Sequence, residues 1–97
     1  MNVQIKTSKS FRRDYKKLSA KDVEATDEVV QLLAANKILP LKYRDHSLHG
    51  NYEGYRECHI RPDLLLVYSK NVDNEIIIYT LYRVNSHTNI FDISKSR

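Results

Sequence analysis

Three of the four histidines of this chain lie within residues 43–63, and the fourth is at position 87. Histidine gives and takes protons near neutral pH, and arginine binds phosphate through a planar fork of N–H groups. Cleavage of RNA through its own 2′-hydroxyl needs a base, an acid and a cation at the phosphate, and it needs no cofactor. The candidate catalytic residues for such chemistry are His46, His59, Asp63, Arg83 and His87.

Each of these side chains, taken alone, also has a structural explanation. His59 can be exposed on a polar sheet face, and His87 can lie beyond the last ordered strand. Arg83 can form an ion pair with Asp63. His49, in the same segment, fits loop surface better than a site. What favours a site is the convergence of several such groups on one rim of a sheet.

A zinc site is the competing use of the histidines, with His46, His49, His59 and Cys58 as four possible ligands. Neighbouring residues of a strand point to opposite faces of a sheet, so Cys58 and His59 do not easily share an ion. A thiol buried on the core face is also a poor nucleophile. We therefore expect no metal, no other cofactor and no catalytic cysteine.

The second half of the chain predicts three strands. In residues 55–61, Cys58 and Ile60 alternate toward the core, so His59 faces away from it. A turn at 62–63 leads to a strand at 64–69, which is apolar on both faces and therefore central. A turn at 71–74 precedes the third strand, at 76–83.

The pairing of these strands decides which side chains share a face. A two-residue turn between the first two strands places His59 opposite Leu66. An even loop before the third strand pairs Leu66 near Tyr79. Tyr79, Leu81 and Arg83 then lie on the face of His59. In any register, the first turn and the end of the third strand lie at the same end of the sheet, where the candidate catalytic residues then meet.

The first half of the chain predicts a short strand at 2–6 and two helices. Ser8 can cap the first helix, and Ser19, with Asp22 three residues later, resembles a capping box for the second. The second helix ends at Asn36. The basic side chains on the first helix suit either a solvated face or a track for the phosphate backbone of RNA: Arg12, Arg13, Lys16 and Lys17.

Together these elements predict one α+β domain over residues 1–97. An N-terminal strand and an antiparallel helix pair pack on one face of a mainly antiparallel, twisted sheet. The segment at 37–54 is a long loop for so small a domain, and such loops are typical of functional sites.

The chain has a net charge of +4 and an isoelectric point near 9.2. The basicity is concentrated in residues 1–44, and a basic surface attracts polyanions such as nucleic acid. There is a single cysteine, no leader-like start and no apolar run of ~18 residues that could span a membrane. We expect a cytoplasmic protein that does not enter a membrane.

The segment KYRDHSLHGNYEGYRECHIRPDLLLVY, followed by LYRVNSH and IF, resembles the YafQ-type branch of the RelE/ParE superfamily of bacterial toxins. The helix motif FRRDYK fits the same pattern, so the resemblance covers residues 3–91. It implies a RelE-like fold, similar to that of microbial ribonucleases. It also implies a toxin that cuts mRNA in the ribosomal A site without a metal and is held inactive by a cognate antitoxin.

By position, the resemblance implies that His87 is the general acid and that Arg83 binds the phosphate in the transition state. The base is either His59, or His46 together with Asp63. Residues that we expect to contact RNA, besides the basic helix, are Phe91, Tyr52, Tyr55 and Arg61.

Two positions depart from the family pattern. Leu64 stands where the family often has Trp, which removes a ring that could stack or pack and leaves the base preference open. Asn85 stands where the family often has Gly, and because Asn tolerates a left-handed backbone we expect the turn to be retained.

Two other functions fit the same fold. One is a ParE-like toxin that binds and inhibits a topoisomerase without catalysis, and the other is a basic RNA-binding domain. The histidine set favours the nuclease, because a binding protein has no evident need for several titratable groups on one rim.

Overall fold

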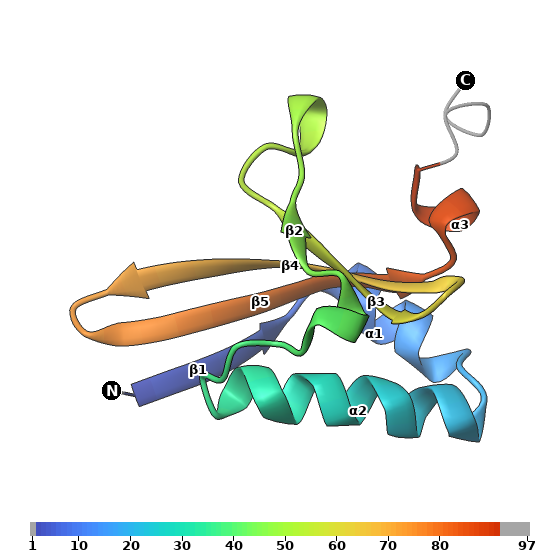
Figure 1. The fold of residues 1–97 in the computed structure, drawn as a ribbon, viewed down its shortest axis with the longest axis horizontal. Coiled ribbons are helices and arrows are strands. Elements are labelled where there is room, and N and C mark those ends of the chain that lie inside the picture. Colours follow the sequence, from blue (N-terminus) through green and yellow to red (C-terminus); the bar gives the residue numbers. More distant parts are fainter. Residues whose placement is uncertain (1, 92–97) are drawn as a thin grey trace.

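The structure is a computed structural model that describes residues 2–91. These residues form one α+β unit, which confirms the predicted class (Figure 1). The strands are β1 (Asn2–Thr7), β2 (His46–Ser47), β3 (Arg56–Arg61), β4 (Leu64–Asp73) and β5 (Ile76–Asn85). The helices are α1 (Lys9–Lys16), α2 (Ala20–Ala34) and α3 (His87–Phe91), with short 3-10 turns at Leu41–Tyr43 and Gly50–Tyr52.

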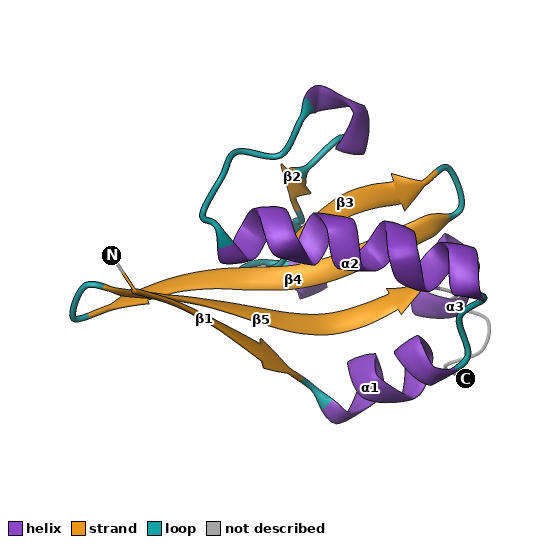
Figure 2. Cartoon of the chain, turned by 90° about the horizontal axis from the view of Figure 1, so that it is seen from below, coloured by secondary structure: helices purple, strands orange, loops and turns teal. Residues whose placement is uncertain are grey.

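α1 and α2 begin at the serines that the sequence indicates. The Ser8 hydroxyl accepts a hydrogen bond from the Phe11 N–H (2.9 Å), and the Ser19 hydroxyl accepts one from the Asp22 N–H (3.2 Å). Asn36 follows α2 with a left-handed backbone (φ 53°), as expected at a helix end,. In Figure 2, α2 crosses one face of the sheet, and α1 lies beside β5 and runs in roughly the opposite direction.

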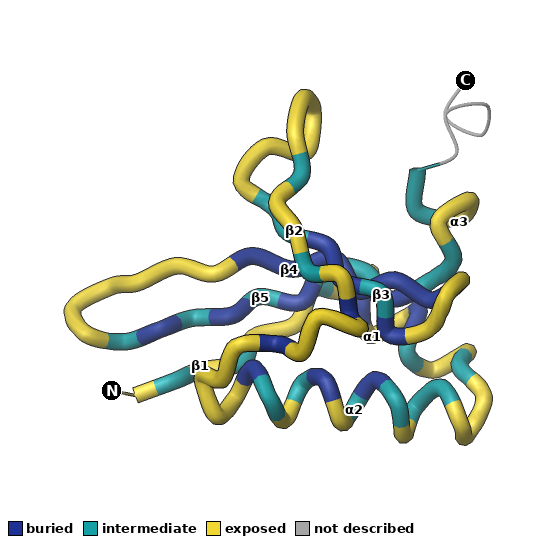
Figure 3. The backbone as a smooth tube through the Cα atoms, in the orientation of Figure 1, coloured by how far each residue is buried: buried dark blue, intermediate teal, exposed yellow. Residues whose placement is uncertain are grey.

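The five strands form one mixed sheet in the order β1-β5-β4-β3-β2. β1 is parallel to β5 and the other neighbours are antiparallel, which confirms a mainly antiparallel sheet. β4 is central, and its residues 64–69 are buried. The β4–β5 hairpin is longer than predicted, because residues 70–73 continue to pair with residues 76–79. Its turn at Asn74 and Glu75 lies at the tip of an arm that is exposed to solvent (Figure 3).

The predicted register of β3 on β4 is wrong by one residue. A β-bulge lies between His59 and Arg61, so His59 pairs with Leu65, and Cys58 pairs with Leu66. Because of the extra residue, the side chains of His59 and Leu66 lie on opposite faces of the sheet. Nothing in the residue types of this stretch marks the bulge.

The predicted register of β5 on β4 is also wrong. Leu66 pairs with Val84 and not near Tyr79, and Tyr79 and Leu81 belong to the core. A second bulge lies on β5, opposite β4 residues 67 and 68. Beyond it, the β5 side chains point to the other side of the sheet from the one that an unbroken register would give. Arg83 therefore does share the face of His59, but only because two bulges compensate each other.

The core lies between the helices and one face of the sheet. Phe11 of α1 and Val29 and Leu33 of α2 pack with Cys58 and Ile60, which confirms the predicted core face of β3. The opposite face carries the loop of residues 44–54 and α3 (Figure 1). No helix within residues 2–91 has the length and apolar character needed to cross a membrane.

Candidate active site

Four residues form a row across the strands on the face away from α2. His46 of β2 pairs with Glu57 of β3, Glu57 with Val67 of β4, and Val67 with Arg83 of β5. Directly paired residues point to the same face, and neighbouring strands lie ~4.8 Å apart. The row therefore spans three inter-strand steps. His59 lies on the same face, two residues after Glu57.

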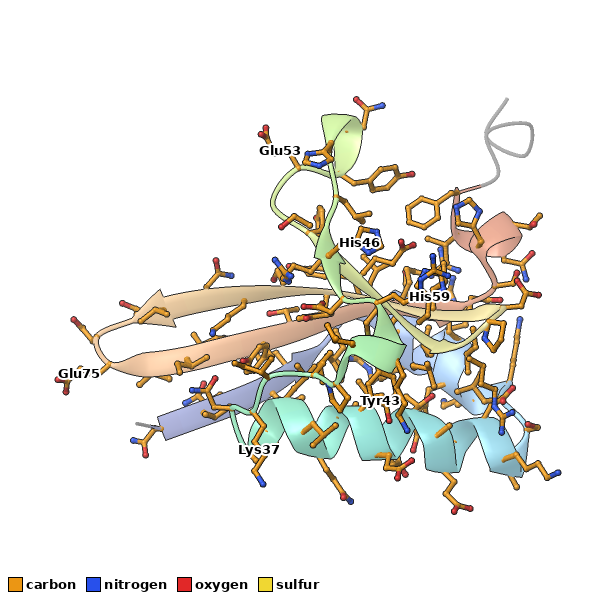
Figure 4. The ribbon with its side chains drawn as sticks, viewed as in Figure 1. Lys37, Tyr43, His46, Glu53, His59 and Glu75 are labelled. Atoms are coloured by element: carbon orange, nitrogen blue, oxygen red, sulfur yellow. The ribbon has the colours of Figure 1, made fainter. Side chains whose placement is uncertain are left out.

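Both ring nitrogens of His46 face acceptors. Its Nε2 lies 2.9 Å from the Glu57 carboxylate, and its Nδ1 lies 2.7 Å from the carbonyl oxygen of Arg44. These two contacts engage both ring nitrogens and fix the orientation of the ring. The rings of His46 and His59 lie 6.3 Å apart (Figure 4). Among the described residues no side chain or backbone group hydrogen-bonds the nitrogens of His59, which are available to a ligand.

Glu57 is a member of the site that the sequence interpretation missed. Its side chain is only 8% exposed, one carboxylate oxygen contacts His46, and the other is buried without a hydrogen-bond partner among the described residues. Leaving a buried acceptor unsatisfied costs about 1–3 kcal/mol, and such groups concentrate at functional sites. The available signal was its position, two residues before His59 on the same strand face.

The segment that carries His46 is anchored to the sheet by a second ion pair. Arg56 donates hydrogen bonds to the Asp45 carboxylate (2.8 Å) and to the Ser47 hydroxyl (2.8 Å). The Tyr68 hydroxyl, in the core, donates to the other oxygen of Asp45. Burial, and then the neighbouring Asp45 carboxylate, raise the pKa of Tyr68, so it remains a donor.

Arg83 forms a bidentate ion pair with Asp14 of α1. Its Nε lies 2.6 Å from Oδ2 and its Nη2 lies 3.1 Å from Oδ1. Burial alone would raise the pKa of Asp14, but hydrogen bonds from Arg83, Val84 and Asn85 hold it below its ordinary value. The hydrogen bond to Asp14 raises the pKa of Arg83, so the guanidinium group keeps its charge.

α3 presents His87 at the end of β5. The Asn85 side-chain oxygen accepts hydrogen bonds from the Ser86 N–H (2.8 Å) and the Asn89 amide (2.9 Å). The turn at Asn85 is retained without a left-handed backbone, since the φ of Asn85 is not positive, and its side chain stabilises the turn. His87 is exposed, with its ring 5.0 Å from that of Phe91.

Aromatic side chains surround a hollow beside Arg83. The ring of Tyr52 meets Phe91 edge-on at 4.9 Å, and Tyr55 meets Tyr82 edge-on at 4.8 Å. The hollow has a volume of about 380 Å³. Its lining combines a cation with ring faces and apolar side chains: Asn51, Tyr52, Tyr55, Val67, Tyr82, Arg83 and Ile90.

Asp63 and His49 lie outside these contacts. Asp63 is exposed in the β3–β4 turn, at the end of the sheet where α3 begins, and none of the described residues hydrogen-bonds its side chain. The alternative in which Arg83 pairs with Asp63 is wrong, because Arg83 pairs with Asp14. His49 is exposed before the second 3-10 turn, as expected for loop surface.

Arg61 faces a different hollow, beside α2. Its Nε lies 2.8 Å from the Asp22 carboxylate. It lines a space of about 380 Å³ together with His59, Lys42 and Arg44. This basic hollow adjoins the row through His59.

The basic residues of α1 lie on its outer face. Arg12 donates from Nη1 to the carbonyl and hydroxyl oxygens of Thr7 (2.8 and 2.9 Å). Arg13, Lys16 and Lys17 are exposed. Asp14, on the inner side of the same helix, contacts Arg83 of the row.

Within residues 2–91 no group of three or more His, Cys, Asp or Glu side chains is arranged to hold a metal ion. Cys58 is buried, and its burial, followed by the Asp45 and Glu57 charges, raises the pKa of its thiol to about 12. It is therefore protonated and inert at neutral pH.

Comparison with known proteins gives consistent matches over nearly the whole chain. A sequence model described as the YafQ bacterial toxin of type II toxin-antitoxin systems matches residues 3–92. The mRNA interferase toxin YafQ of Escherichia coli strain B is 36% identical over 67 residues, 66% of this chain and 73% of that protein.

Two solved structures illustrate the likeness in three dimensions. The E. coli DinJ-YafQ toxin-antitoxin complex contains a chain with a TM-score of 0.78 and 28% identity, covering 94% of this chain and 99% of that one. A metal-bound toxin from Helicobacter pylori has a TM-score of 0.74 and 36% identity, covering 91% of this chain and 98% of that one.

Proposed function

Because this chain belongs to the YafQ family of bacterial toxins of type II toxin-antitoxin systems, we propose that it is an endoribonuclease that cuts ribosome-bound mRNA in the cytoplasm. The observation that carries the proposal is the row of His46, Glu57 and Arg83 on an open sheet face, beside an aromatic hollow. The E. coli relative bears the name mRNA interferase, in line with this activity.

The base in this proposal is His59. Its ring nitrogens are available, whereas both nitrogens of His46 are engaged by Glu57 and by the Arg44 carbonyl. His46 then lies beside the base and is held in place by Glu57 and the Arg44 carbonyl. The alternative base, His46 with Asp63, is less favoured because Asp63 does not contact His46.

The reaction then needs no covalent enzyme intermediate. His59 takes the proton of the 2′-hydroxyl as that oxygen attacks the neighbouring phosphorus, and the bond from phosphorus to the 5′-oxygen breaks. His87 gives a proton to the departing 5′-oxygen. Arg83 and His46 stabilise the charge that builds on the phosphate. The products are a 2′,3′-cyclic phosphate and a 5′-hydroxyl end.

The aromatic hollow suits bases that are unstacked from the strand. Tyr52, Tyr55 and Phe91 offer ring faces and edges next to Arg83, and stacking of a base on a ring is worth ~1–3 kcal/mol,. The basic face of α1 and Arg61 provide contacts to RNA phosphates. An antitoxin partner is proposed from the relative crystallised as the DinJ-YafQ complex.

Primer extension on cellular mRNA tests the proposal. Expression of the wild-type chain is expected to arrest growth and to create new 5′ ends within translated codons. His87→Ala is expected to produce neither, with its circular dichroism spectrum unchanged. Growth arrest without new mRNA ends, accompanied by signs of DNA damage, would favour a topoisomerase inhibitor over the nuclease.

A further inference from the structure

We infer that Asp14 of α1 is a positioning residue for the cleavage reaction, and that it fixes the places of both Arg83 and His87. The inference rests on the proposed function, in which Arg83 binds the phosphate and His87 protonates the leaving oxygen. Asp14 lies on the core side of the basic helix, opposite the face that we expect to meet RNA.

The Asp14 carboxylate accepts four hydrogen bonds from three consecutive residues. Its Oδ2 accepts from Arg83 Nε (2.6 Å) and the Val84 N–H (3.1 Å). Its Oδ1 accepts from Arg83 Nη2 (3.1 Å) and the Asn85 amide (3.2 Å). The side chain is only 7% exposed. One carboxylate therefore fixes the end of β5 against α1.

This arrangement decides how Arg83 meets a phosphate. The guanidinium group has five N–H donors, and Asp14 takes the one on Nε and one on Nη2,. The Nη1 pair and the second Nη2 hydrogen remain, and the side chain is 32% exposed in the aromatic hollow. Asp14 thereby occupies the Nε side of the guanidinium group and leaves its Nη1 side free for the substrate.

The same carboxylate reaches His87 through Asn85. Because the Asn85 amide nitrogen donates to Asp14, its oxygen points toward α3 and accepts hydrogen bonds from the Ser86 N–H and the Asn89 amide. Those contacts hold the first turn of the helix that carries His87. Loss of Asp14 would free both the phosphate ligand and the acid.

The Asp14–Arg83 pair also predicts a pH signature. The pKa of Asp14 in the folded chain lies below its ordinary value of 3.8, despite burial, through its donors. The stabilisation of the folded state by this pair is therefore fully present above pH 3.8. It is lost as the pH falls through the lower pKa that Asp14 has in the folded chain. The stability difference between wild type and Asp14→Asn is expected to disappear under those acidic conditions.

A purely structural role for Asp14 is the alternative, and Asp27 provides a matched control. The Tyr15 hydroxyl donates to the Asp27 carboxylate (2.7 Å), so Asp27 also ties α1 to a neighbouring element without touching Arg83. Asp14→Asn and Asp27→Asn remove the same charge at nearly the same size. A structural role predicts that activity falls with stability in both variants.

The test is single-turnover cleavage of mRNA on purified ribosomes by the full chain. Asp14→Asn is expected to lower the rate at saturating protein by about 100-fold, with little change in the concentration that gives half the maximal rate. Asp27→Asn is expected to keep the wild-type rate. In an Arg83→Ala background, Asp14→Asn is expected to have a smaller further effect of about 10-fold, because only the contribution through Asn85 and His87 remains.

Nuclear magnetic resonance provides a readout that activity does not influence. The Arg83 Nε–H signal is expected to exchange slowly in wild type and in Asp27→Asn, and rapidly in Asp14→Asn. If Asp14→Asn does not fold, Asn85→Ala takes its place: it is expected to slow cleavage about 10-fold while the Arg83 signal persists.

The outcomes separate the two claims. A wild-type chain that leaves ribosome-bound mRNA intact overturns the proposed function and the positioning role with it. An active wild type with an equally active, folded Asp14→Asn overturns the positioning role alone. Equal losses in Asp14→Asn and Asp27→Asn, or full additivity with Arg83→Ala, also overturn it.

Discussion

At the scale of single residues, what separates the histidines is whether their ring nitrogens are already engaged. His46 uses both, one on Glu57 and one on the Arg44 carbonyl, whereas His59, 6.3 Å away, has both available. A base must have an unprotonated nitrogen within reach of the proton it abstracts. The neighbourhood therefore assigns different roles to two residues of the same type.

Single-turnover cleavage by two histidine variants distinguishes these roles. His59→Ala is expected to lose ~10²-fold or more of the rate, because the group that takes the proton is gone. His46→Gln is expected to lose less, because only the neighbour of the base is changed. A larger loss in His46→Gln than in His59→Ala would move the base to His46.

The titratable residues of the site could be proposed from sequence, but their carboxylate partners could not. His46, His59 and Arg83 stood out because their types suit phosphate chemistry. The roles of Asp14 and Glu57 become clear from the residues that they contact, which lie far from them in the sequence. Each also left one local signal. Asp14 lies among Phe11, Tyr15 and Leu18 on the apolar side of its helix, and Glu57 lies two residues before His59 on the same strand face.

At the scale of elements, the site depends on how a two-residue strand is held in place. β2 pairs with β3 only through His46 and Ser47, which is too little to fix an edge strand alone,. The Asp45 carboxylate adds further contacts, because it accepts hydrogen bonds from Arg56 and from the hydroxyl of Tyr68. These hydrogen bonds connect Tyr68 in the core and Arg56 of β3 to the loop that carries His46, and they form its anchor.

Removal of one hydroxyl tests the anchor. Tyr68→Phe is expected to destabilise the chain by about 1 kcal/mol and to slow cleavage about 10-fold, because His46 loses its fixed position. The matched control is Tyr79→Phe, since the Tyr79 hydroxyl donates to Asn36 (2.9 Å) and not to the loop. It is expected to cost similar stability in urea unfolding without slowing cleavage. Equal effects on cleavage would show that the anchor has no specific role.

Element types and caps were readable from sequence, whereas pairings were not. Serine caps, the apolar central strand and the core face of β3 follow from local residue patterns. The two bulges, by contrast, arise from how three strands fit together, and each reverses a face. The sequence interpretation placed Arg83 correctly and Tyr79 and Leu81 wrongly for this reason.

At the scale of the whole molecule, positive charge and the open face lie at the same end. The exposed Arg13, Lys16 and Lys17 belong to the helix whose Asp14 holds Arg83. A surface that neutralises phosphates makes binding strongly dependent on salt. Ribosome binding and catalysis are therefore expected to share one side of the protein.

Charge reversal tests this arrangement. Changing Arg13, Lys16 and Lys17 to Glu is expected to weaken ribosome binding, because fewer RNA phosphates are neutralised. The slope of log affinity against log salt is expected to fall by about one for each phosphate that the protein no longer neutralises. Reversal of Lys6, Lys21 and Lys37 changes the net charge equally and serves as the control. If both triple variants bind ribosomes equally weakly, only the overall charge matters and the helix has no special part.

In the proposed reaction, the RNA supplies its own nucleophile, the 2′-hydroxyl. The most direct test is an mRNA with a single 2′-deoxy nucleotide at the mapped cleavage position, bound to ribosomes and exposed to the wild-type chain. We expect the unmodified message to be cut into 2′,3′-cyclic phosphate and 5′-hydroxyl ends and the deoxy message to stay intact at that position. Cleavage of the deoxy message at the same bond would contradict the account.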